Sequence, residues 1–282
     1  MTENNAILIT GASRGVGRAT ALLACARDWP VGVNYLHDEA AARDVVEDIA
    51  RAGGKAVALR GDVADEEDVV AVFEGATRAL GPLRGVVVNA GIVAPATRLV
   101  DMSVERMRRM FEVNILGAYL TAREAARRMS KSLGGAGGSI VLVSSAAARL
   151  GSPGLYVDYA GSKGAIDTLT LGLAKELAAE GVRVNAVRPG LIDTEMHARS
   201  GAPDRAFRIG ATTPFGRPGT PVAPTVRPPR NGPIIRQRSS WYSRGSTSPN
   251  STTSYRISSS IVAGRRVIGP GKLFFGSGRS PS

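Results

Sequence analysis

Short apolar runs alternate with longer amphipathic stretches along the chain up to about residue 190. The apolar runs predict strands, and the stretches in which apolar residues recur every three or four positions predict helices. Strands separated by helices favour a parallel, doubly wound α/β sheet with helices on both faces. The predicted strands are residues 6–10, 31–35, 55–60, 86–88, 139–143 and 182–187, and helices are expected at 15–27, 38–52, 65–80, 103–129 and from the Tyr159 region to about 179.

The first predicted strand leads directly into a glycine-rich turn and then into a helix. Glycines permit a sharp turn and let backbone N–H groups approach a pyrophosphate at the helix N-terminus, where the helix dipole favours an anion. We therefore expect a dinucleotide to bind here. The predicted contacts are Gly11, Ser13, Arg14, Gly15, Val16 and Gly17.

The second predicted strand ends near Asn34 without an acidic residue at its tip. An Asp or Glu there would accept a hydrogen bond from the ribose 2′-OH of NAD and repel the 2′-phosphate of NADP. Its absence, together with Arg14 in the glycine loop, favours NADP over NAD, with Asn34 as a further contact. The alternative is that Arg14 is a solvated loop cation.

Other candidate residues follow later strands. Asp62 and the backbone of Val63 are candidates for binding adenine, although an Asp in a turn is the plain alternative. Asn89, Ala90 and Gly91 follow a buried strand, and the small residues there permit a flat cofactor to lie close to the backbone. Asn114 lies among apolar residues and needs partners if it is buried, either as a structural hydrogen-bonder or as part of a proton path.

Tyr159 and Lys163 lie four residues apart in a predicted helix, so their side chains share one face. A free phenol has a pKa of about 10, and acid-base work near pH 7 needs a shift of roughly 3 units, or about 4 kcal/mol. A nearby cation favours the phenolate in this way. Ser144 and Ser145 end the preceding strand, at the edge of the sheet where such folds bind ligands.

Together these motifs resemble the classical short-chain dehydrogenase/reductase family over residues 5 to about 220. The matching pieces are Thr10-Gly11-x-x-x-Gly15-x-Gly17, Asp62-Val63, Asn89-Ala90-Gly91, Asn114, a Ser before Tyr159-x-x-x-Lys163, and Pro189-Gly190 followed by Thr194. Sugar or glucose dehydrogenase-like proteins and 3-oxoacyl-carrier-protein reductases look most similar. The resemblance implies a Rossmann-type fold and an NAD(P)-dependent oxidoreductase that interconverts a carbonyl compound and a secondary alcohol.

The resemblance also implies roles for individual residues. Tyr159 would be the general acid or base, Lys163 would hold the nicotinamide ribose and lower the pKa of Tyr159, and Asn114 would keep a water in the proton relay. Ser145 would hydrogen-bond the substrate oxygen; it lies fourteen residues before Tyr159, where the family often has thirteen, and Ser144 is the fallback. The cofactor would also be lined by Asp62, Asn89, Pro189, Gly190, Thr194 and the backbone of Ile192. Substrate choice is expected to lie in residues 94–100, 149–156 and 195–218.

The net charge of +12 is concentrated in the C-terminal part of the chain, because residues 222–282 hold ten basic residues and no acidic one. Their Pro-, Ser- and Arg-rich composition predicts disorder. We expect one NAD(P)-binding domain at 1–221 and a tail at 222–282 that is disordered or read out of frame, with the family's last strand missing. A nucleic-acid partner is disfavoured because the tail holds no folded recognition motif.

This tail leaves an alternative from another class, a nucleotide-binding protein without turnover. A family-like homodimer or homotetramer is expected, weakened by the altered C-terminus. A single cysteine and two histidines argue against a metal site. The sequence contains no apolar run of about 18 residues, so a soluble cytoplasmic protein acting on a small molecule is the expectation.

Overall fold

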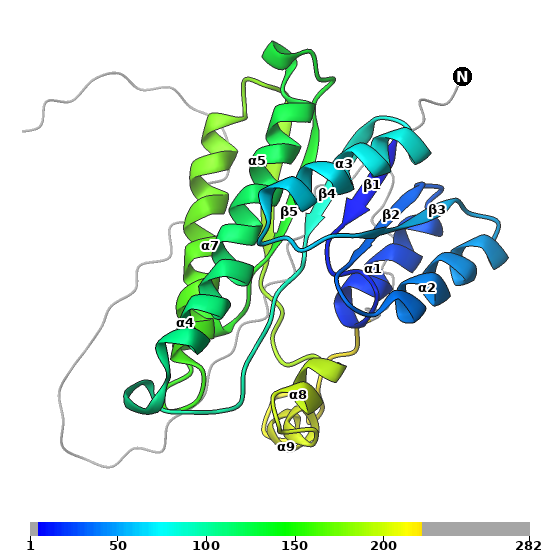
Figure 1. Ribbon diagram of the computed structural model, residues 1–282. Helices are drawn as coiled ribbons and strands as arrows, with labels where there is room; N and C mark the ends of the chain where they lie inside the picture. Colours follow the sequence, from blue (N-terminus) through cyan, green and yellow to red (C-terminus); the bar gives the residue numbers. More distant parts are fainter. Residues whose placement is uncertain (1–4, 222–282) are drawn as a thin grey trace, which may run out of the picture. The chain divides into compact units, whose positions relative to one another are not determined.

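The six predicted strands form one parallel sheet in the computed structural model, which describes residues 5–221 (Figure 1). The strand order is β3-β2-β1-β4-β5-β6, so the order reverses between β1 and β4. The carboxyl ends on either side of such a reversal form the crevice in which doubly wound folds bind their ligands. The strands are β1 Ala6–Ile9, β2 Val31–Tyr35, β3 Ala56–Arg60, β4 Leu83–Val88, β5 Gly138–Val143 and β6 Val182–Val187.

Helices α2 and α3 each begin at an aspartate cap. The side chain of Asp38 accepts a hydrogen bond from the backbone N–H of Ala41 (3.1 Å) at the start of α2 Glu39–Arg51. Asp65 does the same for Asp68 (2.9 Å) at the start of α3 Glu66–Leu80. Such caps satisfy backbone donors that a helix leaves unpaired. The glycine loop precedes α1 Gly15–Cys25, which ends two residues before the predicted end.

The predicted helix 103–129 is divided into three parts. It consists of α4 Val104–Phe111, a π-helical turn η2 Glu112–Leu116 and α5 Gly117–Met129. The prediction of one continuous helix is therefore wrong at its centre. Asn114 lies in the π turn, and such turns frequently mark functional sites.

The second half carries one long helix and several short ones. After α6 Ala147–Leu150, the helix α7 Val157–Glu176 holds Tyr159 and Lys163 and ends three residues earlier than expected. The short helices α8 Glu195–Arg199 and α9 Arg205–Gly210 follow β6. Two 3₁₀ turns, η1 Leu99–Asp101 and η3 Lys131–Leu133, complete the elements among residues 5–221.

Two hydrophobic clusters place the helices on opposite faces of the sheet. One cluster joins the sheet to α3, α5 and α7, with Phe73, Met129 and Ile166 at its centre. The other joins it to α1 and α2, with Ala21, Val45 and other apolar residues of those helices. The two faces confirm the predicted doubly wound architecture.

Strand β6 forms the far edge of the sheet within residues 5–221, where it pairs with β5 alone. Arg183, Asn185 and Val187 of this strand are exposed, whereas Val182 and Val184 are buried. The predictions of a tail at 222–282 and of a missing last strand fall outside the described residues. No helix in the described part of the chain is long and apolar enough to cross a membrane.

Candidate active site

Tyr159 and Lys163 lie on one face of α7, beside the carboxyl end of β5. The Nζ of Lys163 donates a hydrogen bond to the backbone oxygen of Val143 (2.8 Å), and it lies 5.7 Å from the centre of the Tyr159 ring. The Lys163 side chain is buried, and burial lowers the pKa of its amine to about 8. The structure thus places the Lys163 amine near the Tyr159 ring, on the same face of α7, as the four-residue spacing predicts.

The structure distinguishes the two serines at the end of β5. Ser145 forms a side-chain hydrogen bond with Tyr159, and its Oγ accepts one from the backbone N–H of Ala147 (3.1 Å). Ser144 is buried, and its hydroxyl donates to the backbone oxygen of Lys163 (3.1 Å). Ser145 therefore faces the phenol, whereas Ser144 ties β5 to α7.

The expectation that Lys163 lowers the pKa of Tyr159 does not match this geometry. Burial is the largest influence and raises the pKa of the phenol; the hydrogen bond from Ser145 and the charge of Arg205 lower it. Lys163 directs its amine to a carbonyl oxygen instead. The charge of Arg205 lowers the pKa of the phenol, and Arg205 lies in one of the segments expected to choose the substrate.

Asn114 lies under the loop that follows β4. Its Oδ1 accepts a hydrogen bond from the N–H of Ile92 (2.7 Å), and its Nδ2 donates to the oxygen of Ile92 (2.9 Å) and to Ser162 Oγ (3.1 Å). A Cβ added to Gly91 would lie 3.3 Å from Asn114 Oδ1 and 3.4 Å from Lys163 Nζ. The glycine therefore lets the backbone of this loop pass close to both predicted site residues.

The glycine loop fits a bound pyrophosphate. Gly11 and Gly15 have φ values of +61° and +54°, which residues other than glycine rarely adopt. A Cβ at Gly17 would lie 2.4 Å from the oxygen of Gly11 and 2.6 Å from Nδ2 of Asn89. These glycines keep the backbone at the N-terminus of α1 open to an anion, and Ser13, Arg14 and Val16 lie in the same turn.

Asn89 and Thr10 hold the glycine loop against β4. Asn89 Nδ2 donates to the oxygens of Thr10 (2.8 Å) and Gly11 (3.0 Å). Thr10 Oγ1 accepts from the N–H groups of Asn89 (3.0 Å) and Ala90 (3.1 Å). The two loops that the sequence assigns to the cofactor are therefore one hydrogen-bonded unit.

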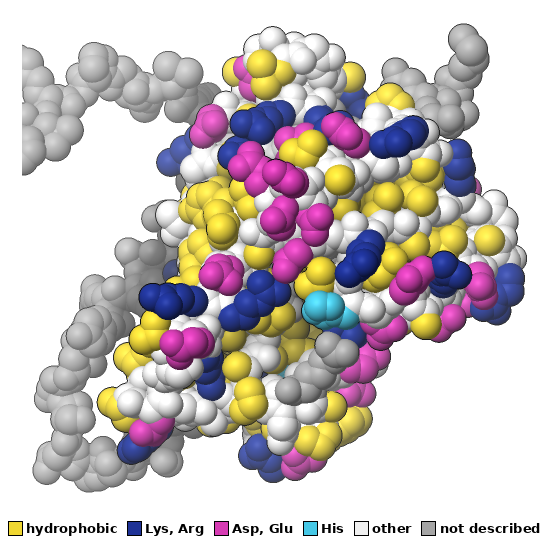
Figure 2. Space-filling model, viewed as in Figure 1, with side chains coloured by type: hydrophobic (Ala, Val, Ile, Leu, Met, Phe, Trp, Pro, Cys, Tyr) yellow, Lys and Arg dark blue, Asp and Glu magenta, His cyan; other side chains and the backbone are white. Residues whose placement is uncertain are grey.

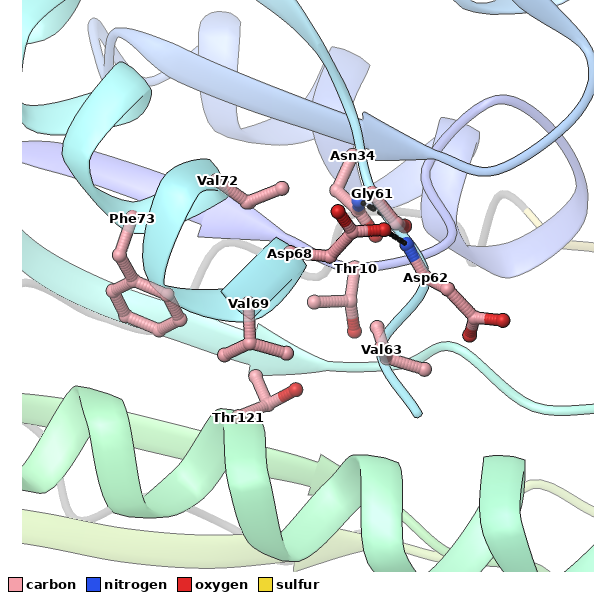
Figure 3. Close-up of a pocket in the computed structure, with 10 residues that line it drawn as sticks. All are labelled: Thr10, Asn34, Gly61, Asp62, Val63, Asp68, Val69, Val72, Phe73 and Thr121. Carbon is pink, nitrogen blue, oxygen red and sulfur yellow. Dashed lines mark hydrogen bonds between the residues drawn. The ribbon is translucent and has the colours of Figure 1, made fainter. Parts of the chain in front are cut away.

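The side chain of Asn34 is held by backbone groups of β3 and of the glycine loop. Its side chain is buried, donating to the oxygens of Leu59 (3.2 Å) and Gly61 (3.1 Å) and accepting from the N–H of Gly11 (3.2 Å). Figure 3 shows Asn34 beside Gly61, among the residues that line a pocket with Thr10 and Asp62. Its hydrogen bonds join the glycine loop to the end of β3, and a contact with the cofactor stays a prediction.

Asp62 and Val63 lie at the end of β3, where the sequence places an adenine site. Asp62 Oδ1 accepts from the N–H of Ala64 (2.9 Å), Oδ2 pairs with Arg109 (3.1 Å), and the N–H of Asp62 donates to Asp68 (2.8 Å; Figure 3). Val63 is buried against Gly117. The Asp62 carboxylate is one quarter exposed, so it remains accessible at the crevice.

A surface hollow of about 360 Å³ lies beside the glycine loop. It is lined by Ser13, Arg14, Arg18, Asp38, Ala41, Asp44 and Glu195. Asp38 Oδ2 lies 3.9 Å from Arg14, and both side chains are partly exposed. The sequence pattern shows no acid at the tip of β2, but the fold brings one to the same place from the cap of α2.

The segment after β6 returns to the glycine loop. Pro189 accepts a hydrogen bond from the N–H of Ala146 (2.9 Å), and Gly190 follows it on the exposed side. Ile192 pairs with Gly219, and its oxygen contacts His197 Nε2 (2.9 Å). A Cβ at Gly15 would lie 3.6 Å from Thr194, so Thr194 lies near the glycine loop.

Sequence reasoning missed two arginines at this site. Arg106 of α4 pairs with the buried Asp158, which precedes Tyr159, and also donates to the oxygen of Pro95 (2.6 Å). Arg205 of α9 lies with its Cζ 5.1 Å from the centre of the buried Tyr156 ring. Asp158, directly before the predicted catalytic tyrosine, was the one signal in the sequence that pointed to a buried ion pair. Its partner Arg106 lies 52 residues away and could not be identified from local sequence.

Comparisons with known proteins agree with this arrangement. The sequence model of the short chain dehydrogenase family matches residues 5–205. An uncharacterized oxidoreductase of Escherichia coli, YgfF, is 51% identical over 212 residues, covering 75% of this chain and 86% of the relative. An L-rhamnose 1-dehydrogenase (NAD(P)(+)) of Sphingomonas sp. is 38% identical over 223 residues, covering 78% and 86%.

A solved structure extends the likeness to three dimensions. A short chain dehydrogenase from Burkholderia cenocepacia in complex with NADP has a TM-score of 0.69 and 30% identity, and the match covers 78% of this chain and 86% of that one. The matched regions include the glycine loop and the tyrosine–lysine pair. Family pattern, relatives and fold agree that this chain belongs to the short-chain dehydrogenase/reductase family of NAD(P)-dependent oxidoreductases.

Proposed function

We propose that Tyr159, Ser145 and Lys163 form the site at which the protein interconverts a carbonyl compound and a secondary alcohol. The observation that carries this proposal is the position of the buried Lys163 amine, 5.7 Å from the centre of the Tyr159 ring, with Ser145 near enough to the same phenol to lower its pKa. The hydroxyls of Ser145 and Tyr159 each carry one proton, and both can turn their O–H groups to the same carbonyl oxygen when a substrate enters. A bound nicotinamide supplies the hydride.

The raised pKa of Tyr159 suits proton donation. Burial keeps the phenol protonated near neutral pH, so it can donate a proton to the carbonyl oxygen during reduction. In the reverse direction Tyr159 must release its proton, and the Ser145 hydrogen bond and the Arg205 charge favour that form. Ser145 would hold the substrate oxygen in both directions.

The cofactor would be held by the glycine loop and by Lys163. Gly11, Gly15 and Gly17 would bind the pyrophosphate, and Lys163 would bind the nicotinamide ribose beside Gly91. Asn114 would position the loop after β4, and the second lone pair of its Oδ1 would accept from a water of the proton relay. The remaining predicted contacts, at 62–63, 89–90 and 189–194, would line the same cofactor.

The decisive test is the oxidation of NADPH, followed at 340 nm, with a panel of aldehydes and ketones. Tyr159→Phe should lower kcat by about 100-fold or more, because a positioned acid contributes that much. Tyr119→Phe is the matched control, since Tyr119 lies partly exposed on α5, away from the site, and it should leave the rate unchanged.

Two results would contradict the proposal. Wild-type activity in Tyr159→Phe would exclude the phenol as the acid. Binding of NADPH without oxidation across the panel would favour the alternative, a nucleotide-binding protein without turnover. The similarity to an L-rhamnose 1-dehydrogenase argues against this alternative.

We further propose that NADPH is the preferred cofactor, with Arg14 binding its 2′-phosphate. The hollow at the glycine loop supports this because it contains Arg14 and Arg18, and one structural relative was solved with NADP. Asp38 argues against a preference for NADPH, because its carboxylate lies 3.9 Å from Arg14 and would repel a 2′-phosphate bound there. Arg14 therefore favours NADPH, whereas Asp38 disfavours it.

Replacing these residues should move the NADPH/NADH ratio of kcat/KM in opposite directions. Arg14→Gln should lower the ratio by about tenfold, the effect of losing roughly 1.4 kcal/mol of charged contact. Asp38→Asn keeps a capping side chain on α2 and should raise the ratio. A ratio unchanged in both variants would remove Arg14 from the cofactor site.

We also infer that the catalytic domain spans residues 1–221 and that copies of it associate through α4 and α5. Figure 2 shows hydrophobic side chains over these helices, and Val104, Phe111, Leu116 and Tyr119 are among the exposed ones. Light scattering of the purified protein measures the resulting oligomeric state.

A further inference from the structure

Arg205 lies against the start of the helix that carries the reactive phenol. It is the first residue of α9, and its guanidinium lies over the ring of Tyr156, 5.1 Å from the ring centre. Tyr156 precedes α7 directly and lies three residues before Tyr159. The charge of Arg205 reaches the Tyr159 phenol, on which it acts in favour of the ionised form. The guanidinium is therefore fixed beside the place where a substrate would react.

The other arginines around this site are neutralised by acids. Arg106 pairs with Asp158 (2.9 Å), Arg188 pairs with Asp167 (2.8 Å), and Arg208 of the same short helix α9 pairs with Asp204 (3.5 Å). Within residues 5–221, Arg205 has no carboxylate within 4.0 Å. The sequence beyond Asp204 contains no Asp or Glu to supply one.

We propose that Arg205 binds a carboxylate of the substrate, so that the preferred carbonyl compounds are acids, such as oxo acids or formyl acids. A guanidinium that is held by its face on an aromatic ring keeps its N–H edge for a second partner. That edge matches the two oxygens of a planar carboxylate. This inference depends on the proposed function, because it assigns the substrate class of the same pocket.

The test compares two aldehydes that differ in charge but have the same reacting group, 4-formylbenzoate and its methyl ester. Each is reduced with NADPH by the wild type, by Arg205→Gln and by Arg208→Gln. The control residue lies on the same helix, is two thirds exposed and pairs with Asp204. The measured quantity is the ratio of kcat/KM for the acid to kcat/KM for the ester, in which any effect on Tyr159 cancels.

The wild type should favour the acid, and Arg205→Gln should lower the acid-to-ester ratio by about 10- to 100-fold, as expected for the loss of a charged hydrogen bond. Arg205→Lys should retain part of the preference, and Arg208→Gln should retain all of it. A ratio that is the same in the wild type and Arg205→Gln would overturn the inference, because Arg205 would then serve only to pack α9 on Tyr156.

Binding without turnover separates this inference from the proposed function. Calorimetry of both aldehydes with protein saturated with NADP⁺ repeats the comparison where no hydride can be transferred. Tighter binding of the acid that is lost in Arg205→Gln supports the carboxylate site even if no carbonyl compound is reduced, a result that would reject the proposed function. Equal binding of acid and ester to the wild type would reject the carboxylate site.

Discussion

Lys163 is buried, and its amine donates a hydrogen bond to the oxygen of Val143. Burial disfavours the charged form, which lowers the pKa to about 8 from an ordinary value near 10.5. Between these two pH values the unfolded chain binds more protons at this position than the folded one. Stability should therefore rise with pH across this window, and the cost of the buried charge is fully present below it.

Comparing Lys163→Met with the wild type tests this directly. From pH 7.5 to pH 10.5 the wild type should gain up to about 3 kcal/mol of unfolding free energy relative to the variant, since one pKa unit corresponds to about 1.4 kcal/mol. Urea denaturation at the two pH values measures the difference. Lys175→Met, at an exposed position of the same helix, is the control. A difference that does not vary with pH would contradict the buried-charge account.

At this scale the sequence predicts what depends on local spacing. Tyr159 and Lys163 meet because four residues are about one helical turn, and Ser145 faces the phenol because it ends the adjacent strand. The hydrogen bonds of Asn34 could not be predicted, because strand position alone does not show that three backbone groups contact its amide. The influence of Arg205 on Tyr159 depends on a fold contact 46 residues away in sequence, which no local pattern indicates.

Among the elements, α4 and α7 are joined by an ion pair beneath the active site. Arg106 Nε lies 2.9 Å from Asp158 Oδ2, and the two side chains are 14% and 1% exposed. Asp158 Oδ1 also accepts from the N–H of Tyr159 (2.9 Å), so the pair fixes the first turn of α7. Removing one partner leaves a buried charge without compensation.

Arg106→Met should therefore lower the unfolding free energy by about 3–5 kcal/mol, measured by chemical denaturation. The matched change Arg98→Met breaks an exposed pair with Asp101 and should cost less than about 1 kcal/mol. A second change, Asp158→Asn in the Arg106→Met background, should recover part of the loss. Equal losses in Arg106→Met and Arg98→Met would mean that the pair contributes no more than a surface pair.

The helices show where sequence patterns lose information. Apolar periodicity predicts α2, α3 and α7 to within a few residues, because each buries one face against the sheet. It misses the π turn at 112–116, since one extra residue in a turn hardly alters the periodicity of a long helix. That turn accompanies the hydrogen bonds of Asn114 to Ile92, which depend on a loop 22 residues away in sequence.

For the whole molecule, the exposed side of β6 has a consequence for solubility. Among residues 5–221 the strand pairs on one side only, and the Val187 side chain is 45% exposed. An unprotected apolar edge is a site at which chains associate, and a charge placed there blunts it. The sequence predicted a strand at 182–187, but the edge itself follows from the order of all the strands.

Val187→Lys should therefore reduce concentration-dependent association, measured by size-exclusion chromatography with light scattering. Leu133→Lys is the control, because Leu133 is 65% exposed in η3, outside the strands of the sheet. If both variants reduce association equally, added charge rather than the β6 edge would be the cause.

The pairing of Ile192 with Gly219 brings the two ends of the segment between them together. The N–H of Asp193 donates to Gly219 (2.8 Å), and the N–H of Gly219 donates to Leu191 (2.9 Å), so both ends are joined beside the sheet. Helices α8 and α9, with Arg205, lie entirely between these two anchors. Residues 193–218 therefore form a segment that can be replaced as a unit. The corresponding segment of another family member could be grafted between the two anchors without altering the strands that carry the active site.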